Sequence, residues 1–233
     1  MRKRRFSIGW PRRDPRHYRF PLPNVVWEYK LKPIEFVLLS YLCCQHTHGG
    51  ANLSPEIIAK GVHMTAGTVK KYLSSLVCRK LITDELSIAP AFQNTDSRKF
   101  FTLPNEIFLL SLPPSAFMVY AYLLLIEDRR THTCHPSYNT IAAETGITKN
   151  TAMKSISDLL KAKLMTMEHS QYFDQYGMKW TGNNLYTVLP TQAAVGQFHQ
   201  RQLDQLELDV ERRRVHKRQE RFTRDRPNAT PRP

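Results

Sequence analysis

The feature of this sequence that most constrains its fold is an internal repeat. The motif Phe-x-Leu-Pro-Asn at 20–24 returns 81 residues later at 101–105. After a slip of two residues the offset becomes 83, and the match continues to Lys-Leu at 80–81 and 163–164. Chance similarities would not keep one order with a single slip, so the chain contains two copies of one structural unit.

Each copy begins with a segment that predicts a long buried helix. Pro33 and Pro114 suit the first turn of a helix, because a missing N–H costs nothing there. The helices expected at 33–46 and 114–127 are apolar on nearly every side. Such helices are typical of the centre of a small domain.

The next two helices of each copy are expected to form a helix-turn-helix. A short helix opens at 54–56 and at 135–137 and closes at Gly61 and Gly146, where glycine is expected to take the left-handed conformation. Thr65 and Thr148 then cap a third helix. The third helices are expected at 66–79 and 149–162, with the core side chains Val69, Leu73, Leu76, Ala152, Ile156 and Leu159.

A two-stranded hairpin is expected after each third helix. The strand pairs are 81–83 with 100–103 and 164–167 with 185–189. Three helices followed by a hairpin are the layout of a winged helix. The predicted fold class is therefore mainly α with small β-hairpins, as two tandem winged helix-turn-helix units plus a C-terminal helix.

The outward faces of the third helices are rich in lysine and small polar residues. A face of this kind fits the major groove of DNA, where lysines reach guanine or phosphate and Asn150 can pair with adenine. Taken singly, each residue is also explained as solvated surface or as a helix cap. The candidate DNA-binding residues are Thr65, Gly67, Thr68, Lys70, Lys71 and Ser74 in the first copy, and Lys149, Asn150, Thr151, Lys154, Ser157 and Lys161 in the second.

The hairpin tips of the two copies differ in composition. The tip at 172–180 is long and aromatic, and Lys179 within it is a further candidate for phosphate contact. Its aromatic residues are equally explained as an apolar patch for a partner or for the other copy. The tip at 93–99 is hydrophilic and is expected to be a plain wing.

Basic flanks surround the two copies. The chain has a formal net charge of +14, and residues 1–19 hold eight Lys and Arg against one Asp. Residues 201–233 hold ten Lys and Arg against six acids. Basic flanks usually meet nucleic acid or another polyanion, because each phosphate contact releases counterions; solubility alone is the alternative.

A C-terminal helix is expected over 192–225. Its thin apolar stripe, Leu203, Leu206 and Val210, either packs on the body or pairs two chains as a homodimer. The expected organisation is a basic disordered arm at 1–17, winged-helix units at 18–100 and 101–190, and a basic helix with a disordered tip at 191–233.

Several classes of function have no support in the sequence. No phosphate-binding loop, nucleophile elbow or paired carboxylates are found, so catalysis and cofactors are not expected. His46-x-His48 and His132-x-Cys134-His135 invite a metal site, but they occupy different positions in the two copies, and no metal is expected. The longest apolar run, of eleven residues, is too short to span a membrane, and the four cysteines suit a reduced, cytoplasmic protein.

The second copy resembles a known family of DNA-binding proteins. Its Leu103-Pro104 opening, with Pro114, Pro136 and Gly146, resembles winged-helix proteins of Gram-positive plasmids and conjugative elements. It is most similar to the N-terminal domain of plasmid replication initiator A proteins, whose helix-turn-helix binds origin repeats. The resemblance implies binding of double-stranded DNA, but this chain differs in carrying two copies and no recognisable further domain.

We therefore expect a non-catalytic, bacterial DNA-binding protein associated with the nucleoid or a plasmid. Its expected role is regulation of transcription or initiation of replication of a mobile element. The alternative is a tandem winged-helix scaffold for protein assembly, with little specific DNA binding. The two differ in salt dependence, since binding through several phosphates weakens steeply as salt rises.

Overall fold

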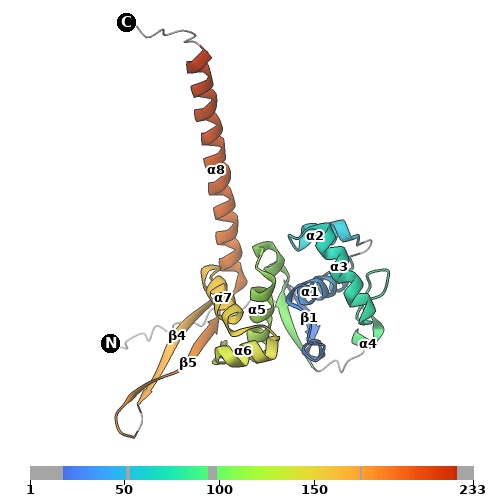
Figure 1. Cartoon of the computed structure of the whole chain (residues 1–233), viewed down its shortest axis with the longest axis vertical. Helices are drawn as coiled ribbons and strands as arrows, with labels where there is room; N and C mark the ends of the chain where they lie inside the picture. Colours follow the sequence, from blue (N-terminus) through green and yellow to red (C-terminus); the bar gives the residue numbers. More distant parts are fainter. Residues whose placement is uncertain (1–17, 51–52, 94–98, 174, 225–233) are drawn as a thin grey trace, which may run out of the picture. The chain divides into compact units, whose positions relative to one another are not determined.

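The computed structural model describes residues 18–50, 53–93, 99–173 and 175–224 (Figure 1). The chain divides into two compact units, Met1–Ala194 and Val195–Pro233, and each is described by itself. The first unit contains both sequence repeats. The arm at 1–17 and the tip at 225–233 lie outside the described residues.

The first repeat contains the predicted helices in the predicted order. Its central helix begins at Pro33, as expected, and Phe36, Leu38 and Leu39 on it are fully buried. The elements are β1 (Arg19–Pro23), the 3-10 helix η2 (Asn24–Trp27), α1 (Pro33–Thr47), α2 (Pro55–Gly61), α3 (Ala66–Cys78) and the short α4 (Pro90–Gln93).

The second repeat has the same helices and a longer hairpin. A three-stranded antiparallel sheet of order β3-β5-β4 forms its wing. The elements are β2 (Phe100–Pro104), η3 (Asn105–Leu110), α5 (Pro114–Ile126), β3 (Thr133–Cys134), α6 (Tyr138–Thr145), α7 (Lys149–Lys161), β4 (Met165–Phe173) and β5 (Lys179–Val188). The prediction of a mainly helical fold with tandem winged helix-turn-helix units is confirmed.

The hairpin predicted for the first repeat is wrong in its pairing. Strand β2 does not pair with residues 81–83 but with β1, antiparallel over the full five residues of each strand. Residues 81–83 instead make a single antiparallel bridge, Ile82 with Ile88. The reason is burial: Phe20 and Leu103 oppose each other in the pair and are both fully buried. The predicted tip falls largely on 94–98, outside the described residues.

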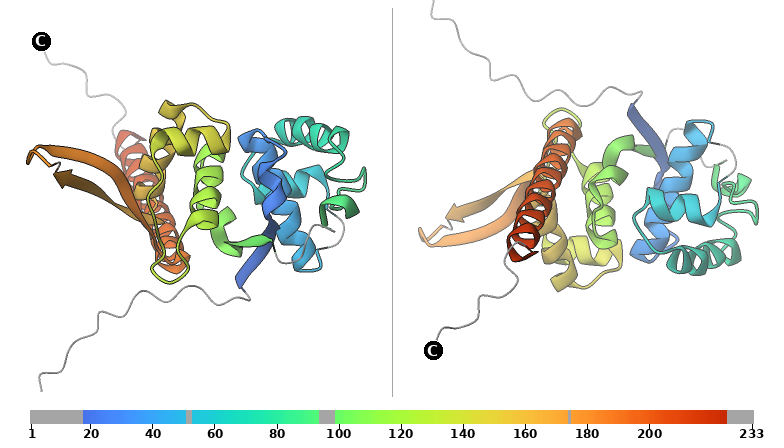
Figure 2. Two further views of the ribbon diagram at one scale, coloured as in Figure 1. Left: turned by 90° about the horizontal axis from the view of Figure 1, so that it is seen from below. Right: turned by 90° about the horizontal axis from the view of Figure 1, so that it is seen from above.

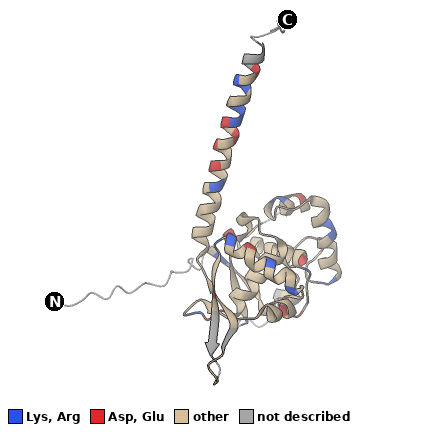
Figure 3. Ribbon diagram, turned by 60° about the vertical axis from the view of Figure 1, so that its left-hand side comes forward, with Lys and Arg blue, Asp and Glu red and all other residues tan. Residues whose placement is uncertain are grey.

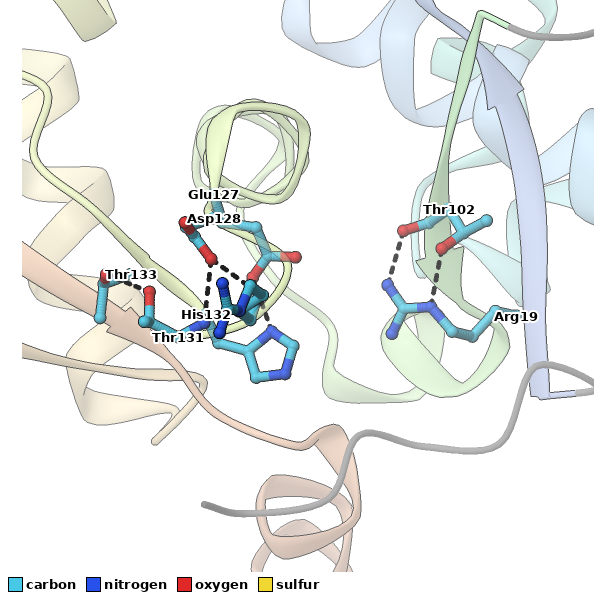
Figure 4. Close-up of polar contacts among 8 residues, drawn as sticks. Arg19, Thr102, Glu127, Asp128, Thr131, His132 and Thr133 are labelled. Atoms are coloured by element: carbon cyan, nitrogen blue, oxygen red, sulfur yellow. Dashed lines mark hydrogen bonds and ion pairs between the residues drawn. The ribbon is translucent and has the colours of Figure 1, made fainter.

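The two repeats share one core. Strands β1 and β2 pair, helices α1 and α5 pack against each other, and buried aromatic rings from both repeats meet between them. At the edge of this pair, the Arg19 guanidinium donates to the Thr102 hydroxyl at 2.9 Å and to the Thr102 carbonyl at 2.6 Å (Figure 4). The repeats are therefore held rigidly, without a linker between them.

Helix α8 (Thr191–Arg224) follows β5 and continues into the second compact unit. Thr191 and Ala194 in its first turn are buried. Further along, Lys and Arg alternate with acidic residues (Figure 3), and Arg212–Asp209 and Arg214–Glu211 form ion pairs three residues apart. The predicted stripe Leu203, Leu206 and Val210 is 54%, 61% and 48% exposed. No helix in the described part of the chain is long and apolar enough to cross a membrane.

Candidate nucleic-acid interface

The third helix of each repeat starts at a side-chain cap, as predicted. The hydroxyl of Thr65 accepts a hydrogen bond from the N–H of Thr68 at 3.3 Å, and Thr148 accepts from the N–H of Thr151 at 3.2 Å. In each pair the two hydroxyls also lie 2.8 Å apart. These bonds satisfy backbone donors that the first turn of a helix leaves open, so both helix starts are fixed before any ligand binds.

The turn before each third helix confirms one glycine prediction and corrects the other. Gly146 has φ +67°, the left-handed conformation that was expected. In the first repeat His63, with φ +55°, takes that place, and Gly61 remains the last residue of α2. Gly61 is needed for space instead, because a Cβ there would lie 2.2 Å from the Tyr41 hydroxyl oxygen.

The predicted core stripes are confirmed, and they fix which faces of α3 and α7 point outward. Val69, Leu73 and Leu76 are buried on α3, as are Ala152, Ile156 and Leu159 on α7. Thr68 and Thr151 are half-buried behind the caps. The remaining candidates are exposed: Thr65, Gly67, Lys70, Lys71 and Ser74 in the first repeat, and Lys149, Asn150, Lys154, Ser157 and Lys161 in the second.

Each outward face has one lysine that is paired with an acid. The Lys70 ammonium lies 2.9 Å from Glu56 at the start of α2, and this hydrogen bond lowers the pKa of Glu56. Lys161 lies 4.0 Å from Asp158 on its own helix. Among the ion pairs of the described residues, none involves Lys149 or Lys154. Lys149 and Lys154 on α7, like Lys71 on α3, therefore have no acidic partner among the described residues.

Glu56 is the residue of this surface that sequence reasoning did not assign. The sequence indicates only that Glu56 lies at the opening of a short helix, where an acid interacts favourably with the helix dipole. Its partner lies in the next helix, so no local periodicity links the two. Close packing of α2 on α3 brings the carboxylate to the exposed face of α3.

The wing of the second repeat extends beyond its helix-turn-helix. Strands β4 and β5 pair from Met165–Val188 to Phe173–Lys179, with an irregularity between His169 and Gln171. At the tip Tyr176 is 81% exposed and Met178 is 60% exposed. Lys179 begins β5, but its side chain and those of the other tip aromatics lie outside the described residues. The contact of Lys179 with phosphate therefore stays a prediction.

The histidine and cysteine segments do not come together as a metal centre. Among the described residues no three His, Cys, Asp or Glu side chains gather where an ion would bind. His132 lies 3.7 Å from the buried Glu127 (Figure 4). Burial raises the pKa of the Cys134 thiol to about 12.

The second repeat matches a known protein family. A family model described as a helix-turn-helix domain matches residues 110–165, which span α5, α6 and α7. These residues are therefore similar to helix-turn-helix domains. The match supports a DNA-binding role for this chain.

The other comparisons add little. A solved structure named "Possible transcriptional regulator from Methanosarcina mazei Go1" is 16% identical, with a TM-score of 0.33, covering 51% of this chain and 93% of that one. Nothing about function is transferred from a likeness this distant. No curated protein matches the chain significantly.

Proposed function

We propose that this protein binds double-stranded DNA through α3 and α7, without catalysis. One observation carries the proposal: α7 starts at a fixed cap and presents Lys149, Asn150 and Lys154 on an exposed face where the two lysines have no acidic partner among the described residues. A major groove admits such a helix, and amide and ammonium groups on it can hydrogen-bond base edges. Phosphate contacts by the other lysines would position the helix on the duplex.

The proposed biological role is regulation of transcription or initiation of replication of a plasmid or conjugative element, in the bacterial cytoplasm. The proposed organisation assigns the basic arm to 1–17, the two winged helices to 18–100 and 101–190, and the basic helix and its tip to 191–233. Footprints at promoters would favour a regulator, and footprints at replication origins an initiator.

Selection of bound duplexes from a random library, at about 150 mM salt, tests the proposal. The native chain is compared with a variant in which Lys70, Lys71, Asn150 and Lys154 are all alanine. A control variant, R212A/R213A/R214A, removes the same positive charge from exposed residues of α8. The control is expected to bind more weakly at every sequence but to enrich the same motif.

The outcomes distinguish recognition of base sequence from nonspecific attraction of DNA by positive charge. If the native chain and the control enrich a motif and the quadruple variant does not, the helices read bases. If the quadruple variant enriches the same motif, or no chain enriches any, base reading by α3 and α7 is refuted.

The alternative function is a tandem winged-helix scaffold for protein assembly. The observation that favours it is the exposed apolar surface of Met153 on α7 and of Tyr176 and Met178 at the wing tip. A scaffold would bind DNA little at any salt, whereas binding through six or more phosphates falls by about 10³-fold or more between 50 and 200 mM salt.

Self-association through α8 is a further part of the proposal, supported by the exposed Leu203, Leu206 and Val210. Light scattering of the full chain and of the L203S/L206S/V210S variant tests it. A dimer is expected for the native chain and a monomer for the variant. Equal masses refute pairing through this helix.

A further inference from the structure

The pairing of β1 with β2 is self-complementary. Phe20 and Leu22 in β1 correspond by the repeat to Phe101 and Leu103 in β2. The register joins Phe20 with Leu103, Pro21 with Thr102 and Leu22 with Phe101. Exchanging the repeats thus converts the first pair into the third and leaves the central pair in place. This is the property of an isologous, two-fold interface between identical subunits.

The aromatic contacts obey the same exchange. The Trp27 ring centroid lies 4.9 Å from that of Phe36, 6.2 Å from that of Phe101 and 5.8 Å from that of Tyr122. Phe108, its equivalent, lies 5.3 Å from Phe117, 5.9 Å from Phe20 and 5.1 Å from Tyr41, which are the three equivalent partners. Phe36 and its own equivalent Phe117 meet at 6.2 Å. A rotation of about 180° therefore relates the repeats, and not a translation.

This rotation determines how two recognition helices would meet one duplex. Both helix-turn-helix elements, teal and yellow, lie on the same side of the β1–β2 pair in the two views of Figure 2. A two-fold rotation also reverses the part of a helix's direction that is perpendicular to the rotation axis. The strands of DNA are related by local two-fold axes, so a two-fold protein reads half-sites arranged as an inverted repeat.

The two half-sites cannot be equal, because the repeats have diverged on their outward faces. Lys149 and Asn150 stand where the first repeat has Ala66 and Gly67. The long β4–β5 wing of the second repeat corresponds to one isolated bridge in the first. The face of α3 also has its Lys70 paired with Glu56.

We infer that one chain reads both halves of an imperfect inverted repeat, with α7 on the more specific half and α3 on the less specific half. The inference rests on the proposed DNA binding. In this arrangement one chain supplies both recognition helices, whereas in a dimer each chain would supply one. The two half-sites are inverted, whereas two helices of the same polarity would read a direct repeat.

The orientation of the half-sites is the first test. The motif selected by the native chain should contain two blocks in inverted orientation at one fixed spacing. A duplex with one block reversed at the same spacing should bind on the order of 100-fold more weakly, as expected when a linked second contact is lost. A motif with one block, or with two blocks in the same orientation, overturns the inference while leaving DNA binding intact.

The second test assigns each block to one repeat. K70A/K71A changes only the face of α3, and N150A/K154A changes only that of α7; circular dichroism confirms that both variants fold. Each variant should lose one block and keep the other, with a loss of affinity for the full site of about tenfold or more for N150A/K154A. If N150A/K154A abolishes both blocks and K70A/K71A neither, two chains read the site through α7, and the inference is wrong. Absence of any motif overturns the proposed function and this inference together.

Discussion

Replacing Gly61 by alanine should destabilise the protein, although alanine is the better helix former. Gly61 ends α2, and a Cβ at this position would lie 2.2 Å from Oη, 2.4 Å from Cζ and 2.7 Å from Cε2 of Tyr41. These distances are too short for real contacts, so the ring or the helix must move. The ring is 8% exposed and stands edge-on against Phe108 at 5.1 Å, which leaves it little room.

The expected magnitude follows from two opposing effects. Forcing an extra methyl into a packed core costs about 1–3 kcal/mol. Alanine regains at most about 1 kcal/mol over glycine in a helix. The net loss is therefore between about 0 and 3 kcal/mol, and its middle value of about 1–2 kcal/mol lowers the melting temperature of a domain of this size by about 2–8 °C.

Thermal and urea unfolding followed by circular dichroism would measure this change. Gly67→Ala is the matched control, because a Cβ there meets no atom within 4 Å, and it should stabilise the protein by up to about 1 kcal/mol. Y41F in the G61A background removes the nearest atom and should recover part of the loss. A G61A variant as stable as the native chain would refute the close approach of α2 to Tyr41.

Three further predictions concern the interface and the thiols. Thr148→Ala should cost about 1 kcal/mol in urea unfolding, because the Thr151 N–H loses its acceptor, whereas Thr148→Ser should cost little. Glu56→Gln should tighten DNA binding and steepen its salt dependence in fluorescence anisotropy, because it frees Lys70; unchanged binding would mean that Lys70 faces no phosphate. Burial raises the pKa of Cys43 and Cys134 to about 12, so at about pH 8 a thiol reagent should modify the exposed Cys78 first. Equal rates for all four thiols before unfolding would contradict this burial.

Local signals in the sequence were sufficient for the helices. Pro33 and Pro114 begin α1 and α5, and Thr65 and Thr148 cap α3 and α7, because caps and first-turn prolines act within one turn of the chain. The outward faces followed from the same periodicity. Whether those faces contact DNA stays a prediction.

Interactions between distant segments account for what the sequence did not reveal. The alternation of apolar and polar side chains in 100–104 is compatible with pairing to either segment. Only the burial of side chains in the complete fold selects β1 over residues 81–83 as its partner. His63, and not Gly61, takes the left-handed conformation, whereas Gly61 leaves space for the ring of Tyr41 from another helix. The ion pair of Glu56 with Lys70 depends on the packing of two helices in the same way.

The pairing of β1 with β2 also has a consequence for folding during synthesis, because the two strands are made at different times. Residues 19–23 leave the ribosome long before their partner strand at 100–104 exists. At about 5–20 residues per second, the first strand waits about 4–16 s. During that time Phe20 and Leu22, fully buried in the finished protein, have no neighbouring strand to cover them. The two repeats are thus separate as proposed DNA-binding surfaces but not as folding units. A chain that ends before residue 100 would expose an uncovered apolar strand.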